Sequence, residues 1–362
     1  MSKAVITRFQ PSITEWFASI GKIKESEKFR KEDVCKHQRL EILFQKLGLL
    51  YERPINFSSR DLILKTPEFL KIYNKNDLCA IRLIPKKDRL PKFRMRGLPI
   101  KKCYNDWFLA QKINYDDYVA QICPHSETLL WSISFVINDK MIFGEIIRGL
   151  HSQLTHGETE SELYQFQYDY KKWRWSKYNQ AAEKQVKKIV NSLKISSKGK
   201  RKVLKKLLKV KFCRDFIVGY FEATVWPDKK ERLIDFNRML PRYIKTPPQL
   251  AAKNSSKFVS GVPAFPGKTS GKAVLVNEKN ISRIKFSSGN ILVCDNTDVR
   301  YLPLMKKAAA IVTDRGGILT HAAIISRELK KPCIINTREA TKKIESGNLI
   351  FVDAAKGIIK KL

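Results

Sequence analysis

The segment that most constrains the fold reads AAAIVTDRGGILTHAAIISREL and runs from Ala308 to Leu329. Its apolar start predicts a buried strand, which leads through a turn at Gly316 and Gly317 into a helix whose first residues include Thr320 and His321. Backbone N–H groups in such a turn and in the first turn of a helix lack partners, and the helix dipole adds positive charge there. Phosphate groups bind at such places, and an imidazole located there can accept a phosphoryl group. The segment therefore predicts a phosphate-carrying histidine, His321, surrounded by Gly316, Gly317 and Thr320.

The sequence around this segment is typical of a compact α/β domain. Short apolar strands alternate with helical stretches, and the strands read KAVLV, NILVC, AAAIVT, CIIN and LIFVDA. Before them, residues 246–260 combine Pro, Ser, Asn and Ala without periodicity, which is typical of an exposed linker. We therefore place a C-terminal domain at 261–362 and expect it to rotate as a unit about this linker.

These motifs resemble the phosphohistidine signature of the phosphoenolpyruvate-utilising enzymes, the family of phosphoenolpyruvate synthase and pyruvate phosphate dikinase. The resemblance extends over GVPAFPGKTSGKAVLV before the histidine segment and over RELKKPCIIN and ESGNLIFVDAAKGII after it. It implies a swivelling β/β/α domain that carries phosphate between two remote sites. This sequence departs from the usual signature at Leu319, where a hydroxyl or amide residue is common, and has its hydroxyl at Thr320 instead.

The stretch GYFEATVWPDKKERLIDFNRMLPR predicts a β-hairpin with acidic residues on both strands. Asp235 and Asn237 are two residues apart on one strand and so share a face, where their oxygens could hold Mg²⁺. Pairing of the strands would allow Glu222 to reach the same ion. The pattern resembles the metal-binding hairpin of ATP-grasp domains, although Glu is more usual at the place of Asp235. A surface hairpin with incidental acids is the alternative.

The resemblance implies that ATP is the phosphoryl donor and that cationic side chains upstream contact its phosphates. Arg82 in the strand AIRLIP occupies the matching place, and the further candidates are Lys86, Arg94, Arg96 and Arg148. The strand VAQICP resembles the hinge that contacts adenine, with backbone groups from Gln121 to Cys123. The glycine-rich loop that often covers the phosphates is missing from residues 1–96, which contain only Gly21 and Gly48. We expect His125, His151 and His156 to be structural or exposed.

The remaining chain predicts two further regions. Residues 1–78 read as mostly helical, with Leu40, Leu43, Phe44, Leu47 and Leu50 on one helical face. Residues 79–245 contain short apolar strands and are expected to form an ATP-grasp-like nucleotide-binding domain. The fold class is therefore mixed α/β and α+β, in several domains. Between 171 and 214 lies a Lys-rich helical stretch, which we interpret as a solvated face with an apolar side formed by Val203, Leu204, Leu207 and Leu208.

The charge balance favours anionic partners. The chain has 70 Lys and Arg against 35 Asp and Glu, a formal net charge of +35, so nucleotides and nucleic acids are candidate partners. Its seven cysteines form no CxxC pair, which argues against a zinc site or a disulfide framework. No apolar run is long enough for a membrane helix, and the N-terminus does not resemble a signal peptide. We expect a cytoplasmic protein without a membrane partner.

We therefore predict an ATP- and Mg²⁺-dependent phosphotransferase of the dikinase type that passes a phosphoryl group through His321 to an acceptor, which is anionic or a small molecule. About a hundred C-terminal residues and about 170 in the nucleotide-binding segment leave no room for the phosphoenolpyruvate-binding (β/α)₈ barrel, which takes roughly 250 residues. Two alternatives remain open. One is a non-catalytic RNA- or ribonucleoprotein-binding protein on the same scaffold, and the other is an ATP-grasp ligase that makes an acyl phosphate.

Overall fold

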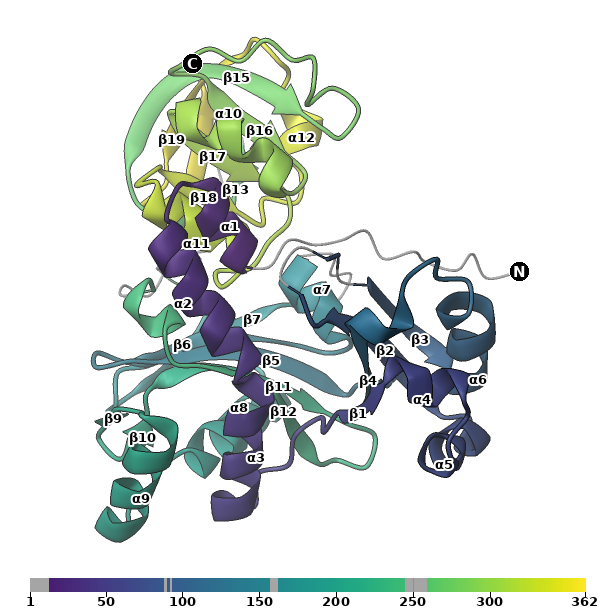
Figure 1. Cartoon of the computed structure of the whole chain (residues 1–362). Coiled ribbons are helices and arrows are strands. Elements are labelled where there is room, and N and C mark those ends of the chain that lie inside the picture. Colours follow the sequence, from purple (N-terminus) through teal and green to yellow (C-terminus); the bar gives the residue numbers. More distant parts are fainter. Residues whose placement is uncertain (1–12, 88–89, 92, 157–161, 245–249, 251–258) are drawn as a thin grey trace.

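The computed structural model of the chain describes residues 13–87, 90–91, 93–156, 162–244, 250 and 259–362. Three sheets and the helices that cover them account for most of these residues (Figure 1). The predicted linker at 246–260 lies outside the described part of the chain except for residues 250, 259 and 260. No helix among the described residues is long and apolar enough to cross a membrane.

The smallest of the three sheets is antiparallel and has the order β1-β4-β2-β3. Its strands are β1 (Ile55–Ser58), β2 (Leu78–Pro85), β3 (Phe93–Pro99) and β4 (Tyr118–Pro124). One face packs on α4 (Ser59–Ile63), α5 (Pro67–Lys75), α6 (Ile100–Lys102) and the π-helical turn Cys103–Phe108. Ile81 and Leu83 point to this covered face, so Arg82 between them points to the opposite face.

The second sheet is antiparallel with six strands in the order β12-β11-β5-β6-β7-β8. These are β5 (Trp131–Ile137), β6 (Ile142–Ile147), β7 (Tyr164–Tyr168), β8 (Trp173–Trp175), β11 (Gly219–Val225) and β12 (Glu231–Asn237). One face is apolar and packs on α3 (Lys36–Leu47), α8 (Gln180–Ser192) and α9 (Lys198–Leu208). The other face carries polar residues, among them Glu145 and Glu222. A short helix, α7 (His151–His156), follows β6, and a two-stranded ribbon, β9 (Phe212–Cys213) and β10 (Phe216–Ile217), follows α9.

The C-terminal domain contains an eight-stranded mixed sheet with the order β13-β20-β19-β15-β16-β17-β18-β14. Its strands are β13 (Val259–Ser260), β14 (Val262–Phe265), β15 (Lys268–Val276), β16 (Ile291–Cys294), β17 (Ala310–Thr313), β18 (Cys333–Ile335), β19 (Leu349–Asp353) and β20 (Ile358–Lys361). Strands β15 to β18 run parallel to their neighbours in that series. The helices are α10 (Leu302–Lys307), α11 (His321–Glu328) and α12 (Ala340–Lys343).

Two N-terminal helices connect this domain to the rest of the chain, α1 (Ile13–Ser19) and α2 (Ile23–Val34). Helix α1 contacts α11, and Trp16 is buried in a cluster that also contains Ile324. Helix α2 is fixed to the other half by Glu32, which accepts hydrogen bonds from the backbone and guanidinium of Arg238 after β12. In Figure 1 these helices run from the C-terminal domain down to the six-stranded sheet. Packing therefore holds the C-terminal domain against the other half.

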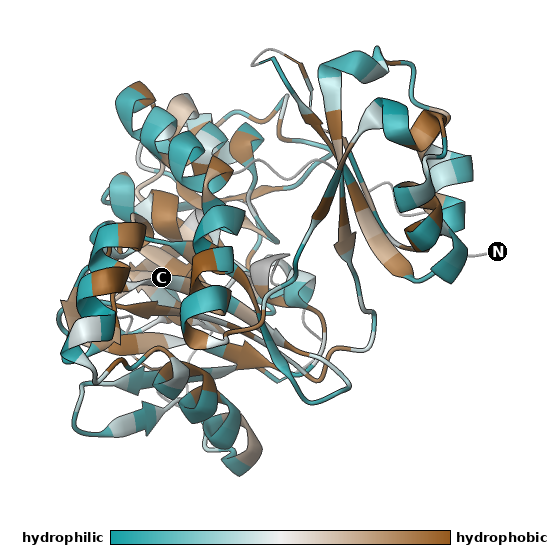
Figure 2. Ribbon diagram, turned by 60° about the horizontal axis from the view of Figure 1, so that its bottom comes forward, coloured by the Kyte–Doolittle hydropathy of each residue, from teal (hydrophilic) through white to brown (hydrophobic). Residues whose placement is uncertain are grey.

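The strands predicted from apolar runs are present as β2, β4, β5, β6, β15, β16, β17, β18 and β19. The strands are mostly hydrophobic and the helices show hydrophobic and hydrophilic sides (Figure 2). Residues 1–78 do not form a separate unit, because β1 pairs with β4 and α3 packs on β12. The apolar side predicted for the Lys-rich stretch is only half right. Leu204 and Leu208 are buried, whereas Val203 and Leu207 are each 46% exposed.

Candidate active site

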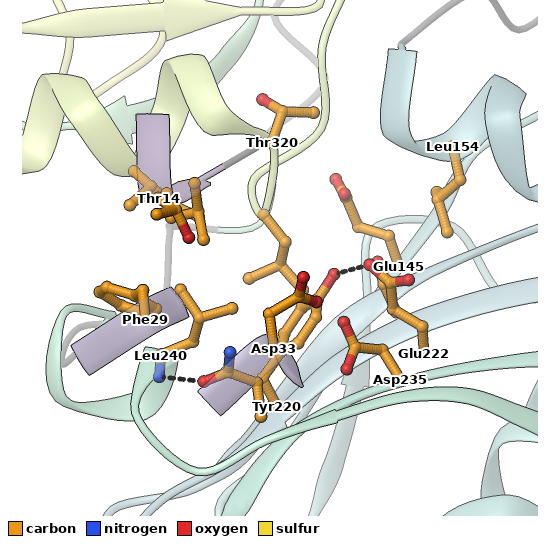
Figure 3. Close-up of a pocket in the computed structure, with 15 residues that line it drawn as sticks. Thr14, Phe29, Asp33, Glu145, Leu154, Tyr220, Glu222, Asp235, Leu240 and Thr320 are labelled. Carbon is orange, nitrogen blue, oxygen red and sulfur yellow. Dashed lines mark hydrogen bonds between the residues drawn. The ribbon is translucent and has the colours of Figure 1, made fainter. Parts of the chain in front are cut away.

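A pocket lies between the polar face of the six-stranded sheet, helix α2 and the start of α11 (Figure 3). The sheet contributes Glu145, Glu222, Asp235 and Asn237, and the C-terminal domain contributes Thr320. The three metal-ligand candidates and the segment before His321 are thus walls of one pocket, although they are about a hundred residues apart in sequence. This arrangement is what a transfer between the two regions requires.

The acidic residues come from the predicted hairpin, now β11 and β12. Glu222 and Asp235 are direct cross-strand partners, next to an irregularity in register between Glu222 and Ala223. Asn237 lies two residues further on the same strand, and its side-chain oxygen accepts hydrogen bonds from the backbone N–H groups of Met239 (2.8 Å) and Leu240 (2.9 Å). Asn237 therefore lines the pocket and also holds the turn after β12.

The two opposed carboxyl groups differ in their neighbours. Burial would raise the pKa of Glu222, but the charge of His151, whose Nε2 lies 3.0 Å from Oε2, and the hydroxyl of Tyr220 lower it below the ordinary value. Burial raises the pKa of Asp235 to about 6 against the opposing charge of Lys36, and the negative charge of Glu222 adds to the rise. The surroundings therefore favour the ionised form of Glu222 and disfavour the ionised form of Asp235.

Lys36 was not identified from the sequence, yet it faces these acids. It is the first residue of α3, and its Nζ lies 4.0 Å from Oδ2 of Asp235 and 3.9 Å from Oδ1 of Asp33. The charge of Asp235 raises the pKa of Lys36. The next residue, His37, is affected by the positive charges nearby. Burial, and after it the charges of Lys36 and Arg82, lower the pKa of His37 to about 4.

The acidic pair fits a divalent cation. Two carboxyl groups on adjacent strands are hard oxygen donors, which Mg²⁺ prefers, whereas the amide oxygen of Asn237 already accepts two backbone hydrogen bonds. The raised pKa of Asp235 reflects mainly the burial of this carboxyl group, and a bound cation would stabilise its ionised form. Among the described residues there is no cluster of three or more His, Cys, Asp or Glu side chains in a metal-binding arrangement. A metal here would therefore depend on Glu222, Asp235 and oxygens from substrate or water, and Asn237 could join them only by giving up a hydrogen bond from Met239 or Leu240.

Three arginines share the open face of the small sheet. Arg82 is the cross-strand partner of Arg94, and Arg96 follows two residues later on the same face. Burial and then the charges of Arg96 and Arg82 lower the pKa of Arg94 to about 10. The Nε of Arg82 is buried without a hydrogen-bond partner in the described part of the chain. Three mutually repelling guanidinium groups with an unpaired buried donor are typical of a site for a polyanion.

The other cationic candidates are not brought to this place. Lys86 is exposed, and its Nζ donates to the backbone oxygen of Asp116 at 2.8 Å. Arg148 is exposed, and its guanidinium lies 5.0 Å from the ring centre of Trp131. Neither residue lines the pocket described above.

The adenine-hinge prediction needs correction for Gln121. This residue is in β4, an inner strand of its sheet, where Asn56 of β1 and Arg82 of β2 are its partners on the two sides. Its backbone groups are therefore used in the sheet and cannot contact adenine. Its side chain donates to Oδ1 of Asn56 at 3.1 Å on the face that carries the arginines. Cys123 lies beyond the last residue paired with β1 and has a partner only in β2.

The turn before α11 is docked on the six-stranded sheet. Both carboxylate oxygens of Glu145 accept from the backbone N–H of Ile318, at 3.1 and 3.0 Å. Gly316 has a φ of 125°, which favours glycine, and Thr320 is the residue before the helix, with its hydroxyl donating to the backbone oxygen of Gly317 at 2.8 Å. Helix α11 begins at His321, as predicted.

Sequence reasoning missed several residues of this site. His151 was expected to be structural or exposed, but it contacts Glu222. Lys36 begins an ordinary amphipathic helix, α3, and nothing in the sequence around it indicated that it belongs to the site. Glu145 did give one, because a lone carboxylate in the apolar strand MIFGEIIRG needs a partner when buried.

Comparisons with known proteins agree with the sequence analysis of the C-terminal domain. Residues 286–357 match the family described as PEP-utilising enzyme, mobile domain. Phosphoenolpyruvate synthase of Aeropyrum pernix is 39% identical over 136 residues, which are 38% of this chain and 16% of that protein. An uncharacterized phosphotransferase of Bacillus subtilis is 38% identical over 107 residues, 30% of this chain and 13% of that protein. The chain thus spans less than a fifth of the length of these relatives.

A solved structure of the ATP-grasp ligase PsnB is similar over 57% of this chain and 52% of its own chain. The sequence identity is 9% and the TM-score 0.29, values too low to bear on the chemistry of the site.

The opposed carboxyl groups predict a stability change in Asp235→Asn. The folded protein holds the pKa at about 6 against an ordinary value of 3.8, so between these pH values the unfolded chain ionises first and wild-type stability falls as pH rises. The neutral amide avoids this loss. We expect Asp235→Asn to be more stable than wild type by about 2 to 3 kcal/mol above pH 7 without metal, and to lose this advantage at pH 4.

Denaturant unfolding at several pH values in chelator measures this difference. Asp228→Asn, in the exposed turn of the same hairpin, is the control. The Arg232 side chain lowers the pKa of Asp228, so removing this carboxylate should not stabilise the protein as pH rises. A variant at Asp235 that is less stable than wild type at pH 7 to 8 would contradict the assignment of Asp235 as a strained carboxyl group.

Proposed function

Because residues 286–357 match the mobile domain of phosphoenolpyruvate-utilising enzymes, we propose that the chain is an ATP-dependent phosphotransferase in which His321 carries the phosphoryl group. The nucleotide would bind between the arginine face of the small sheet and the acidic hairpin. The C-terminal domain would then leave the pocket and present the phosphoryl group to an acceptor bound elsewhere.

One observation carries this proposal, the presence of Thr320 in the lining of the same pocket as Glu222 and Asp235. The residue after Thr320 begins α11, so the candidate nucleophile follows directly from the pocket lining. Phosphoryl transfer depends mainly on positioning and on charge neutralisation, and the pocket supports both.

The arginines of the small sheet, which do not line the pocket themselves, and the carboxyl groups that do would have different roles. Arg82, Arg94 and Arg96 would neutralise the nucleotide phosphates, and Glu222 with Asp235 would hold Mg²⁺. Bound Mg²⁺ offsets negative charge on the phosphate oxygens. A ring nitrogen of His321 would form the N–P bond while the P–O bond to the leaving oxygen breaks with its electron pair. By resemblance to the family, the nitrogen would attack the β-phosphorus and AMP would leave, so that both the β- and γ-phosphoryl groups are on His321. Water would then cleave the anhydride bond between them, which releases phosphate and leaves the β-phosphoryl group on the nitrogen.

His321→Ala tests the carrier directly. Wild type incubated with Mg²⁺ and ATP labelled at the β position should gain acid-labile label, and the variant should gain none, because it lacks the nitrogen that forms the bond. Parallel incubation with γ-labelled ATP identifies the transferred group. A folded variant that is labelled as strongly as wild type would contradict the proposal.

Arg82→Gln tests the nucleotide site. Loss of a half-buried cation next to two others should raise the Kd for Mg·ATP by roughly tenfold to a hundredfold, as expected for a charge-assisted contact. Lys86→Gln removes the same charge from an exposed place and should change the Kd by less than about twofold. Isothermal titration calorimetry measures both. Equal effects of the two substitutions would place the nucleotide elsewhere.

A second candidate function is nucleic-acid binding, and helix α9 favours it. Five of its lysines are exposed and make no ion pair with any described residue: Lys198, Lys200, Lys202, Lys205 and Lys206. Within a chain of net charge +35, this helix offers a row of cations to a phosphate backbone. The surface is remote from the acidic pocket, since α9 covers the opposite face of the six-stranded sheet.

The charge-reversal variant Lys200→Glu/Lys202→Glu/Lys205→Glu/Lys206→Glu should bind single-stranded RNA and duplex DNA more weakly than wild type. The slope of log K against log salt should also fall by about 2 or more. Fluorescence anisotropy at several salt concentrations measures both values. The matched control reverses Lys279, Lys285, Lys360 and Lys361, exposed residues of the C-terminal domain. An equal loss in the control would mean that net charge, and not α9, determines binding.

A further inference from the structure

We infer that Glu145 is a positioning residue that docks the phosphohistidine domain at the ATP site, and that its negative charge favours release of this domain once His321 is phosphorylated. This inference rests on the proposed function, because it concerns when the carrier arrives and leaves. Glu145 belongs to the nucleotide-binding half and contacts the C-terminal domain three residues before His321.

The burial of Glu145 makes this contact specific. Glu145 is 1% exposed, at the centre of β6 between Ser134 of β5 and Gln165 of β7. Gln165 donates to its Oε1 at 3.0 Å and so fixes the carboxylate from within the sheet. A second donor to the carboxylate is the backbone N–H of Ile318, which comes from the other domain. Docking therefore provides part of the solvation that this carboxylate lost on burial.

Gly317 permits the close approach. A Cβ atom added there would lie 2.2 Å from Oε2 of Glu145, a distance at which one of the groups must move. The φ of Gly317 is outside the left-handed region, so alanine is compatible with the turn itself. The glycine is therefore required by the docked state and not by the local backbone.

The backbone of Ile318 is hydrogen-bonded on both sides, by Glu145 and by Arg327. Arg327 of α11 donates from Nη1 to the backbone oxygen of Ile318 at 2.9 Å, while Glu145 accepts from the N–H of the same residue. Arg327 travels with its own domain and keeps the turn in shape. Glu145 belongs to the six-stranded sheet and does not move with the C-terminal domain. Its hydrogen bond to Ile318 therefore exists only when the C-terminal domain is docked.

Two other polar contacts that hold the C-terminal domain involve residues that do not line the pocket. Lys22 pairs with Glu328 at the far end of α11, and Lys306 donates to the backbone oxygen of Ser19 at 3.5 Å. Glu145, by contrast, lines the pocket together with Thr320, Glu222 and Asp235. During charging, bound Mg²⁺ and the arginines would offset these negative charges. After the nucleotide and Mg²⁺ leave, a phosphoryl dianion at the start of α11 would face Glu222 and Asp235, which keep His151 and Lys36 beside them, and Glu145, which has no ion pair with a described basic side chain. The negative charge of Glu145 would then repel the loaded domain.

Substitutions at the two partners test the docking contact. Gly317→Ala should slow labelling from ATP by about a hundredfold, because the added methyl group displaces the turn, while the Kd for Mg·ATP stays within about twofold. Glu145→Ala should slow labelling less, and Glu145→Ala/Gly317→Ala should label faster than Gly317→Ala alone, because the clash is gone. Gly199→Ala is the control, since its added Cβ would have no neighbour closer than 3.9 Å.

This rescue separates docking from damage to the turn. If the methyl group harmed the turn itself, removing Glu145 would not restore labelling, and a double variant as slow as Gly317→Ala would overturn the inference. Circular dichroism and the Mg·ATP affinity verify that each variant is folded.

Hydrogen exchange tests docking and release without relying on turnover. The peptide containing Ile318 should exchange faster in Gly317→Ala than in wild type before any ATP is added, and equal exchange would overturn the docking contact. After Mg·ATP is added and then removed, exchange should increase in wild type and increase less in Glu145→Gln, which keeps the shape of the side chain without its charge. An equal increase in both would overturn the role of the charge. Wild type that gains no label would refute the proposed function, while the exchange measured before ATP would still decide the docking contact.

Discussion

Two carboxyl groups, those of Glu222 and Asp235, face each other across the hairpin of β11 and β12, and much of the pocket is arranged around the cost of burying them. His151 stabilises the charge of Glu222, and Lys36 lies beside Asp235. Even so, the pKa of Asp235 remains raised, to about 6. A fold gains nothing in stability from such a pair, so its presence points to a ligand whose positive charge completes the site.

The architecture brings distant parts of the chain to this pair. The six-stranded sheet has one apolar face, which packs on α3, α8 and α9, and its other face is left for polar groups. The small sheet turns its arginine face away from its own helices. Helices α1 and α2 then bind the C-terminal domain to the rest, so that the turn before α11 closes the pocket. The described conformation is the one in which a carrier would be charged.

Local patterns in the sequence predicted much of this structure. Alternation placed Asp235 and Asn237 on one face of a strand, and the apolar run before Gly316 predicted the strand, turn and helix around His321. The resemblance to a known family then predicted that the hairpin with Asp235 and the segment with His321 act in one phosphoryl-transfer reaction. These inferences succeeded because each depends on neighbours within about a dozen residues.

The remaining features depend on tertiary contacts that no local pattern contains. Lys36 and His151 begin short helices of ordinary composition, and only the packing of α3 and α7 brings them to the acidic hairpin. Gln121 was misread because an inner strand and an edge strand have similar sequences, although only the edge strand has free backbone groups. Val203 and Leu207 are exposed because α9 presents a narrower face to the sheet than its apolar residues indicated.

A crystal structure with Mg²⁺ and a non-hydrolysable ATP analogue tests the central claim most directly, since the claim is that ATP and the start of α11 meet in one pocket. We predict density for a metal ion on Glu222 and Asp235, with the nucleotide phosphates between this ion and Arg82. The start of α11 should face the same phosphates. A nucleotide bound elsewhere, or a metal ion that contacts neither carboxylate, would contradict the account.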